Sequence, residues 1–296
     1  MIVLQHGFFK RWRLLLSKDT STKSPEFVII SSSGSGLSLK EIYRYRHLLY
    51  YIIYKDVVGK YKQAILGIGW KLLTPFLNMV VLTLLFGVVA KLPSEPGLPY
   101  ALLVYSGTLG WNLFATIFNN SANSVLANAA LLTKVYFPRM LLPLSSIGEA
   151  CMDFGVAMSI LIALMLYYGY TPGWVLLLLP LAILLCIIAG LSVGLFFAAI
   201  LPKYRDFGYL CPFVLSLWMM LSPVAYLAQS WPESIQWIIA LNPMVGVIEF
   251  ARWCILGGGS SFSGAHLSYS IVFFGLLLIA GVRFFLKRER HILDVL

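Results

Sequence analysis

The sequence has few charged residues. Asp, Glu, Lys and Arg make up 11% of its 296 residues, against about 25% in a typical soluble domain. Hydrophobic residues reach 59%, and several uncharged runs have the roughly 20 residues that span about 30 Å of hydrocarbon. The alternating ten-residue segments typical of outer-membrane barrels are absent. The composition therefore predicts an all-α polytopic membrane protein.

Residues that perform chemistry are also scarce. The four cysteines stand in apolar segments at wide spacings, which indicates neither a zinc site nor a disulfide framework. We interpret Cys151, Cys186, Cys211 and Cys254 as small buried hydrophobic residues. The run SSSGSG at 31–36 lacks the Gly-Lys-Ser/Thr of a phosphate-binding loop, so we expect no ATP site and no other cofactor or metal site in this chain.

Six membrane spans are predicted from the uncharged runs. They cover residues 72–90, 98–118, 147–168, 174–200, 207–227 and 267–286. The fifth is interrupted by Pro212 and Pro223. The start of the chain has neither a long apolar run nor a small-residue cleavage site, so no signal peptide is expected.

The basic residues are distributed unevenly between the two sides of these spans. Of the 22 Lys and Arg residues, only Lys91 and Arg252 fall on the side opposite to the rest. Because Lys and Arg concentrate in cytoplasmic loops, both termini are predicted to be cytoplasmic. The net charge of +10 follows mainly from this asymmetry and does not require a nucleic-acid partner.

Two carboxylates stand inside the third predicted span. Glu149 and Asp153 are one helical turn apart, and intramembrane carboxylates are functional candidates. A structural ion pair with Arg139 or Arg205 is the alternative. A proton-coupled carrier would need more ionisable residues at mid-depth than this chain has.

The region before the first span divides into two parts. Residues 1–36 form a basic, Ser-rich leader that we expect to be flexible. From 37 to 62 the pattern is that of an amphipathic helix, with polar and aromatic residues on one face and apolar residues on the other. The first face carries Lys40, Arg44, His47, Tyr51 and Lys55, and the second Ile42, Tyr45, Leu49 and Ile52. Such a helix lies in the headgroup layer or packs on a protein partner.

The loop between the second and third spans contains NAALLTKVYFPR, which predicts a short helix stopped by Pro138. Its apolar residues face the cytoplasm, where no lipid covers them, so the segment either binds a protein partner or lies against the membrane underside.

Residues 228–266 contain two apolar pieces that are each too short to cross a bilayer. Asn242 and Pro243 separate them, as a helix break with an N-cap candidate. Non-helical backbone at membrane depth persists only inside protein or beside a wet cavity. Two re-entrant half helices at the outer mouth of a pathway fit this pattern, and a helix pair covering the bundle is the alternative. Glu249 and Arg252, three residues apart, are expected to pair.

Four segments carry a resemblance to a known family. KYKQAILGIGWKLLTP (60–75), LLTKVYFPR (131–139), PKYRDFGYL (202–210) and LNPMVGVIEFARW (241–253) occur in order and at suitable distances. Over residues 37–290 the chain resembles the permease subunits of ABC exporters for bacterial surface polysaccharides, the O-antigen (lipopolysaccharide) and teichoic-acid transport family.

The resemblance implies an architecture and a set of partners. The permease would be a homodimer in the bacterial inner membrane, bound to two copies of a separate ATPase that holds ATP and Mg. The exported molecule would be a polysaccharide linked to undecaprenyl diphosphate. Residues 37–62 would be the interface helix, 128–139 the coupling helix, 228–258 the periplasmic gate helices and 291–296 a cytoplasmic tail. An ABC permease for drugs or small lipids and a membrane enzyme of glycan synthesis are the alternative functions. The enzyme would need clustered catalytic groups such as Asp-x-Asp, which this sequence lacks.

Candidate site residues follow from this resemblance in four groups. Contact with the ATPase is assigned to Leu131, Leu132, Lys134, Val135, Tyr136 and Arg139. Contact with the lipid diphosphate is assigned to Arg44, Arg46, Lys60, Lys62 and Lys71, and attraction to anionic lipids is the alternative. Aromatic faces on which sugars slide are assigned to Tyr100, Tyr105, Trp111, Phe114, Trp218 and Tyr226, and anchoring at the membrane interface or packing between helices is the alternative. The gate is assigned to Asn242, Pro243, Glu249 and Arg252.

Overall fold

The computed structural model describes residues 39–61, 69–135, 137–258 and 262–292. All regular structure in these ranges is helical, and residues 38–296 form one compact unit. The predicted leader lies outside the described residues. So do residues 293–296 of the predicted tail.

Five helical stretches among the described residues are long and apolar enough to cross a membrane. They are α4 (Gly69–Leu82) with its π-helical continuation η1 (Thr83–Val89), α5 (Tyr100–Ala127), α7 (Leu141–Tyr168), the 3-10 turn η2 (Trp174–Leu178) with α8 (Leu179–Ile200), and α12 (Gly264–Ile292). They correspond to the first, second, third, fourth and sixth predicted spans. The chain is therefore an all-α multi-pass membrane protein, as its composition predicts.

The fifth predicted span is a shorter helix in the structure. Helix α9 (Phe207–Met220) has 14 residues, or about 21 Å at 1.5 Å per residue. It continues through Pro212 and ends before Pro223, because a proline disfavours helical conformation in the residue before it. Residues 221–227 contain no regular helix.

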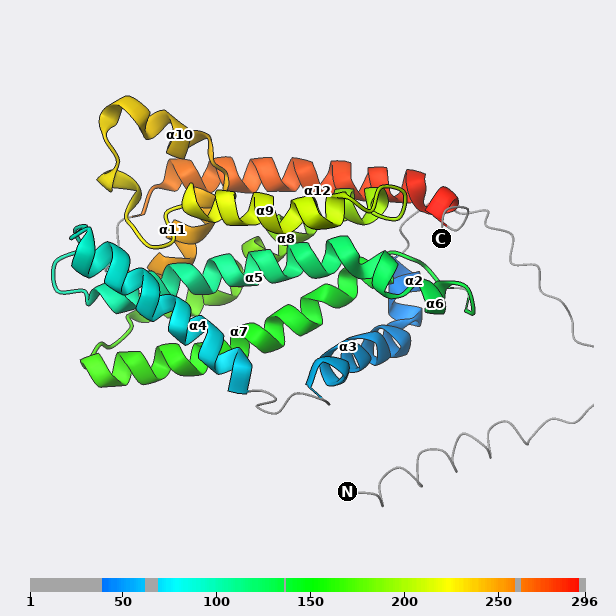
Figure 1. Ribbon diagram of the computed structural model, residues 1–296, viewed down its shortest axis with the longest axis horizontal. Coiled ribbons are helices and arrows are strands. Elements are labelled where there is room, and N and C mark those ends of the chain that lie inside the picture. Colours follow the sequence, from blue (N-terminus) through cyan, green and yellow to red (C-terminus); the bar gives the residue numbers. More distant parts are fainter. Residues whose placement is uncertain (1–38, 62–68, 136, 259–261, 293–296) are drawn as a thin grey trace, which may run out of the picture. The chain divides into compact units, whose positions relative to one another are not determined.

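Helix α5 is the centre of the bundle (Figure 1). It packs against α7 and α8. In its most apolar stretch of 18 residues 83% of the residues are buried, against 6% in the corresponding stretch of α4 and η1. Gly190 and Gly194 of α8 allow close contact with α5, because a Cβ at these positions would lie 2.7 Å from Ile117 Cβ and from Ser121 Cβ respectively. Small residues four apart are a common means of bringing membrane helices together. Helix α5 extends nine residues beyond the predicted end of the span, through a polar stretch in which Ser121, Ala122, Ser124 and Val125 are buried in the bundle.

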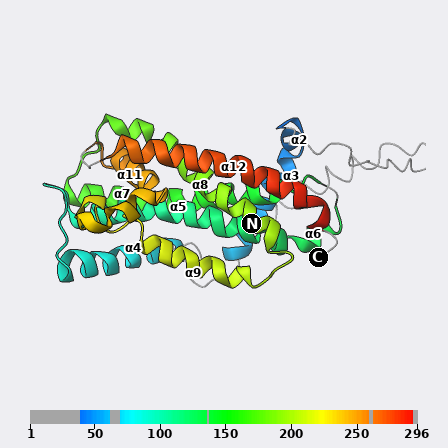
Figure 2. The ribbon, with the colours of Figure 1, turned by 90° about the horizontal axis from the view of Figure 1, so that it is seen from above.

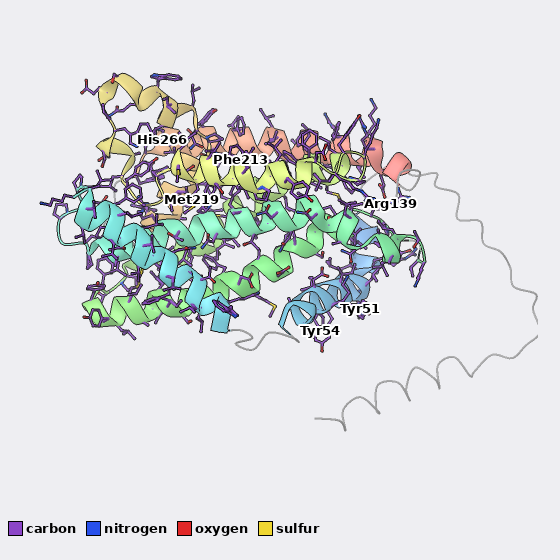
Figure 3. All side chains as sticks on the ribbon, in the orientation of Figure 1. Tyr51, Tyr54, Arg139, Phe213, Met219 and His266 are labelled. Atoms are coloured by element: carbon purple, nitrogen blue, oxygen red, sulfur yellow. The ribbon has the colours of Figure 1, made fainter. Side chains whose placement is uncertain are left out.

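The amphipathic segment forms two helices, α2 (Leu39–Arg44) and α3 (Arg46–Tyr61). Helix α3 packs on α7, with Ile53 against Gly148 and Ile52 fully buried. Tyr51 and Tyr54 are 56% and 57% exposed and stand on α3 in Figure 3. The two predicted faces are therefore distinct in the structure.

The two ends of the bundle carry different short elements (Figure 1). The α6 end has the four-residue helix α6 (Ala129–Leu132) and the last turns of α12. The α10 end has the turns η3 (Ala228–Ser230) and η4 (Glu233–Ile235) and the helices α10 (Gln236–Leu241) and α11 (Met244–Ile255). Helix α11 is almost wholly buried and packs between α5, α8 and α12 (Figure 2), whereas Trp237 and Leu241 of α10 are 61% exposed.

Candidate transport and coupling sites

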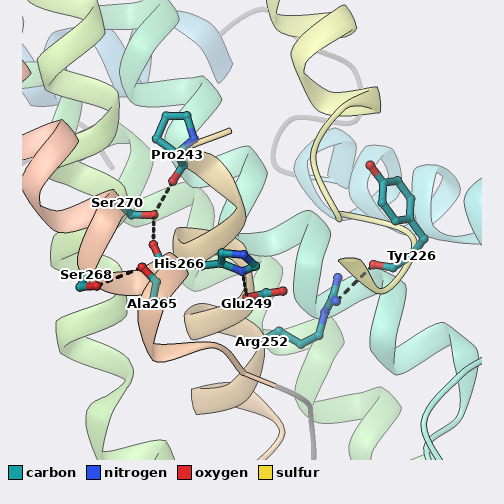
Figure 4. Close-up of polar contacts among 8 residues, drawn as sticks. All are labelled: Tyr226, Pro243, Glu249, Arg252, Ala265, His266, Ser268 and Ser270. Atoms are coloured by element: carbon teal, nitrogen blue, oxygen red, sulfur yellow. Dashed lines mark hydrogen bonds and ion pairs between the residues drawn. The ribbon is translucent and has the colours of Figure 1, made fainter. Parts of the chain in front are cut away.

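Arg252 of α11 lies inside the bundle, with a relative exposure of 2%. Its Nη2 donates hydrogen bonds to the carbonyl oxygens of Pro223 (2.5 Å) and Val224 (2.9 Å), and its Nη1 donates to Tyr226 O at 3.4 Å (Figure 4). These carbonyls belong to the segment 221–227, which contains no regular helix. The guanidinium therefore stabilises the break in the chain after α9.

The expected pairing of Glu249 with Arg252 is not what the structure has. Glu249 Oε2 instead lies 3.1 Å from Nδ1 of His266, at the start of α12 (Figure 4). Arg252 is directed to the carbonyls because they are packed against its own helix, while Glu249 faces α12. His266 is not among the predicted site residues, although it is the single histidine in the predicted outer segment.

Helix α5 approaches the same non-helical segment from the other side. Tyr100 Oη donates a hydrogen bond to Ala225 O at 2.5 Å. Gly107 is close enough that a Cβ there would clash with Val224 O and Arg252 Nη2. The segment 223–226 is thus held between α5 and α11, and the sequence pattern contains no direct signal for Gly107.

Asn242 joins the end of α9 to the corner between α10 and α11. Its Oδ1 accepts hydrogen bonds from Trp218 Nε1 (2.9 Å) and from the backbone N–H of Met244 (3.0 Å). Its Nδ2 donates to Leu221 O (3.1 Å) and Ser222 Oγ (3.0 Å). The bond to Met244 joins residues two apart, but the N-cap residue of α11 is Pro243 and no side chain caps this helix, so the N-cap expected at Asn242 is not formed. Pro243 O accepts a bond from Ser270 Oγ at 2.6 Å, which attaches the corner to α12.

Most of the aromatic residues assigned to a channel are core residues in this structure. Tyr105, Trp111, Phe114 and Tyr226 have relative exposures of 7% or less. Phe114 and Trp218 rings are 5.2 Å apart at their centroids, and Tyr105 Oη donates to Ala157 O. These four rings are packed between helices of the bundle, and their assignment to a channel stays a prediction. Tyr100 and Trp218 are half-buried.

The α6 end carries the predicted coupling segment. Helix α6 ends at Leu132, well before Pro138, and continues as a turn through Thr133 and Lys134. Leu132 is buried at 8% exposure, whereas Val135 is 48% exposed. The expectation that both present an apolar face is wrong for Leu132, because its side chain packs inside the bundle. Leu131 is half-buried, and Tyr136 lies outside the described residues.

Two contacts hold this turn to the rest of the bundle. Lys55 Nζ of α3 donates to Asn128 Oδ1 at 2.5 Å, and the backbone N–H of Arg139 donates to Glu289 Oε1 of α12 at 3.2 Å. Arg139 appears beside the end of α12 in Figure 3. A displacement of α6 would therefore act on α3 and α12 together.

The basic residues assigned to the lipid diphosphate are in different environments. Arg44 and Arg46 are exposed on α2 and α3, and the Arg46 guanidinium lies 4.5 Å from the Tyr43 ring centroid. Lys71 forms an ion pair with Asp153 of α7, a pairing that replaces the alternatives with Arg139 or Arg205. The side chain of Lys60, and Lys62 as a whole, lie outside the described part.

Glu149 is buried, and its Oε2 accepts a hydrogen bond from Asn120 Nδ2 at 2.9 Å. Cys186, Cys211 and Cys254 are buried and Cys151 is half-buried, and all four are free thiols. In the described ranges no three His, Cys, Asp or Glu side chains come together to hold a metal ion.

Comparison with known proteins places this arrangement in a family. Residues 47–256 match the model described as ABC-2 type transporter. The O-antigen export system permease protein RfbA of Myxococcus xanthus is 32% identical over 212 residues, which cover 71% of this chain and 80% of that protein. A Klebsiella pneumoniae protein of the same name is 26% identical over 267 residues, 88% of this chain and 100% of that protein.

A polysialic acid transport protein, KpsM of Escherichia coli, is 25% identical over 243 residues, covering 79% of this chain and 90% of that protein. The family match extends from α3 to the residue after α11 and so includes both ends of the bundle. The chain belongs to the ABC-2 type transporter family.

Proposed function

We propose that the chain is the membrane-spanning permease subunit of an ATP-driven exporter of lipid-linked polysaccharide. The observation that carries this proposal is the similarity, over most of the chain, to permeases named for O-antigen export. The substrate class is a glycan on an undecaprenyl diphosphate carrier, moved from the cytoplasm to the periplasm. The permease acts in the bacterial inner membrane with both termini cytoplasmic.

Energy comes from a separate ATPase that binds ATP and Mg. The exposed turn after α6, with Lys134 and Val135, supports this contact because it projects from the α6 end beyond the buried part of the bundle. Its links to α3 and α12 offer a route by which ATPase movement reaches the membrane helices. The complex has two permeases and two ATPases, so the bundle described above is half of the membrane part.

The glycan leaves at the α10 end, where the chain is broken at 221–227 and again at Asn242–Pro243. Carbonyl oxygens of the first break accept hydrogen bonds from Arg252 and Tyr100, and Asn242 and Ser270 bond to the backbone at the second. Tyr100 and Trp218 border this region as half-buried aromatic residues. They are the members of the predicted channel set that a modest opening would expose.

The carrier diphosphate binds at the opposite end, near α2 and α3. Arg44 and Arg46 support this assignment because their guanidinium groups are exposed and able to form bidentate bonds with phosphate oxygens. Lys60 and Lys62 stay as predicted contacts. Lys71 fits the role less well, since its charge is already balanced by Asp153.

Deletion of the gene followed by separate assays of surface and cytoplasmic lipid-linked polysaccharide tests the proposal. We expect the glycan to disappear from the surface and to accumulate inside, with restoration by a plasmid copy. Loss from both places would indicate an enzyme of glycan synthesis. No change in either pool would indicate an exporter of drugs or small lipids.

A further inference from the structure

A cleft of about 370 Å³ lies between α4, α5 and α7, three helices that contact one another (Figure 1). Its volume is within the range of about 300–1,000 Å³ that is common for small-molecule sites. Each helix contributes residues at helical spacing. In α4 they include Lys71, Thr74 and Asn78, and in α5 Asn112 and Thr116.

The cleft opens at a defined depth. Helix α3 packs on α7 at Gly148, and the cleft lining on α7 begins at Ala150, two residues or about 3 Å further towards the α10 end. The cleft therefore begins just beyond the amphipathic helix, inside the apolar part of the bundle. Trp70 at its edge is 51% exposed.

The polar groups of this cleft are not accounted for by packing. The side chains of Asn78 and Asn112 form no hydrogen bond with any described residue; Asn112 is half-buried and Asn78 is exposed on α4. An amide without a hydrogen-bond partner raises the free energy of the protein in hydrocarbon. The two asparagine side chains therefore indicate contact with water or with a polar ligand.

The charge of the cleft limits which ligand fits. Among the described residues that line it, Lys71 and Asp153 carry charge, and they neutralise each other as an ion pair. An anionic phosphate would meet no net positive charge here, and an acyl chain would leave both amides unsatisfied. A neutral molecule with many hydroxyl groups satisfies both conditions, because hydroxyls donate and accept hydrogen bonds. Trp70 offers the apolar face on which a sugar ring packs.

We propose that the α4–α5–α7 cleft binds neutral sugar units of the transported glycan. The site is a sugar subsite between α4, α5 and α7, and Asn78, Asn112 and Asp153 are its hydrogen-bonding groups. This inference rests on the proposed export function. It adds a place at which the permease recognises the glycan itself.

The first test measures occupancy of the cleft in cells. The four native cysteines are replaced by Ala, Thr116→Cys is added, and alkylation by N-ethylmaleimide is followed with the ATPase partner inactivated. We expect alkylation several-fold slower in cells that make the lipid-linked glycan than in cells whose first glycan-forming transferase is deleted. Asn123→Cys is the matched control, because Asn123 is exposed on the same side of α5 two turns away and should react equally in both strains.

Equal rates for Thr116→Cys in the two strains, or no reaction in either, would overturn the inference. Equal alkylation rates combined with glycan accumulation inside the permease-deletion strain would reject the sugar site and leave the export function supported. If the permease-deletion strain accumulates no glycan inside, both the sugar site and the export function are overturned.

A second test uses the opposite effects that a structural and a binding role predict. Asn112→Leu removes an amide without a described partner, so a merely structural role predicts unchanged or higher thermal stability and normal export. We expect several-fold slower appearance of surface glycan with unchanged stability and ATPase co-purification. Asn123→Leu should leave export at the wild-type rate, and wild-type export by Asn112→Leu would contradict the sugar site.

Discussion

Arg252 is a buried cation whose partners are carbonyl oxygens instead of a carboxylate. Three such oxygens lie on the segment 223–226. Each would otherwise be an unsatisfied buried acceptor, at a cost of about 1–3 kcal/mol. The arginine therefore makes a non-helical backbone tolerable inside the bundle, in the way that side chains of neighbouring helices stabilise broken membrane helices.

The close approach of α5 to this segment depends on the absence of a side chain at Gly107. Gly107→Ala would place a methyl group against Val224 O and Arg252 Nη2. Overpacking of this kind costs about 1–3 kcal/mol, more than the gain of about 1 kcal/mol in helix propensity. We expect a lower thermal unfolding midpoint for the detergent-purified permease.

Gly155→Ala is the control for this substitution, because no atom lies within 4 Å of a Cβ at Gly155 of α7. It should raise the midpoint slightly or leave it unchanged. A Gly107→Ala protein as stable as the wild type would show that the segment 223–226 is not held against α5.

Leu132 is buried and Val135 is exposed, so substitutions at these two positions distinguish an effect on ATPase binding from an effect on folding. Val135→Glu places a charge on a half-exposed position of the turn after α6. We expect it to abolish co-purification of the ATPase while the thermal midpoint stays unchanged. Leu132→Glu, at a buried position, should lower the midpoint itself. Retention of the ATPase by Val135→Glu at wild-type stoichiometry would count against this contact.

At the scale of elements, the two breaks at the α10 end are connected. Asn242 bonds both to the end of α9 and to the first residue of α11. The corner between α10 and α11 is therefore positioned by α9 as well as by its own proline. A movement of one break is expected to displace the other.

Replacement of Asn242 and Pro243 together by Ala tests this corner. Alanine is the best helix former, so α10 and α11 would tend to join into one helix from Gln236 to Ile255. We expect surface glycan to fall strongly while the permease stays in the membrane and retains its ATPase. Unchanged export by the double variant would remove the gate assignment. Asn123→Ala, on an exposed face of α5, should export normally.

At the scale of the whole molecule, the distribution of buried residues is that of a bundle surrounded by lipid. Helix α5 is mostly enclosed, whereas α4 and α9 leave large apolar side chains such as Phe76 exposed, and Phe213 of α9 is labelled in Figure 3. Lipid covers such residues without cost. Their exposure thus agrees with a multi-pass membrane protein and by itself identifies no partner.

The orientation in the membrane is testable with two exposed positions. In the background without native cysteines, Ser94→Cys lies in the α4–α5 connection and Lys203→Cys in the α8–α9 connection. A membrane-impermeant maleimide should label Ser94→Cys in intact spheroplasts and Lys203→Cys only after permeabilisation. The reverse pattern would overturn the placement of both termini in the cytoplasm.

Several features of the fold were predictable because they depend on local properties of the chain. The fourth span was predicted at 174–200, the range that η2 and α8 occupy, since hydropathy over about 20 residues determines membrane insertion. The division of α10 from α11 at Asn242–Pro243 was likewise visible in local helix-breaking chemistry. The second span was predicted to end at residue 118, whereas α5 continues to Ala127. Its polar last turns pack partly against neighbouring helices, which hydropathy does not reveal.

By itself the sequence determined the helical class, the positions of the long membrane helices and the expected asymmetry of charge. Each of these is a sum over neighbouring residues in contact with a bilayer. The tertiary structure alone decided that Tyr105 and Phe114 are core residues, that Arg252 binds carbonyls and Glu249 binds His266, and that Lys71 pairs with Asp153. These pairings join residues from separate helices, and their formation depends on which side chains meet when the bundle packs.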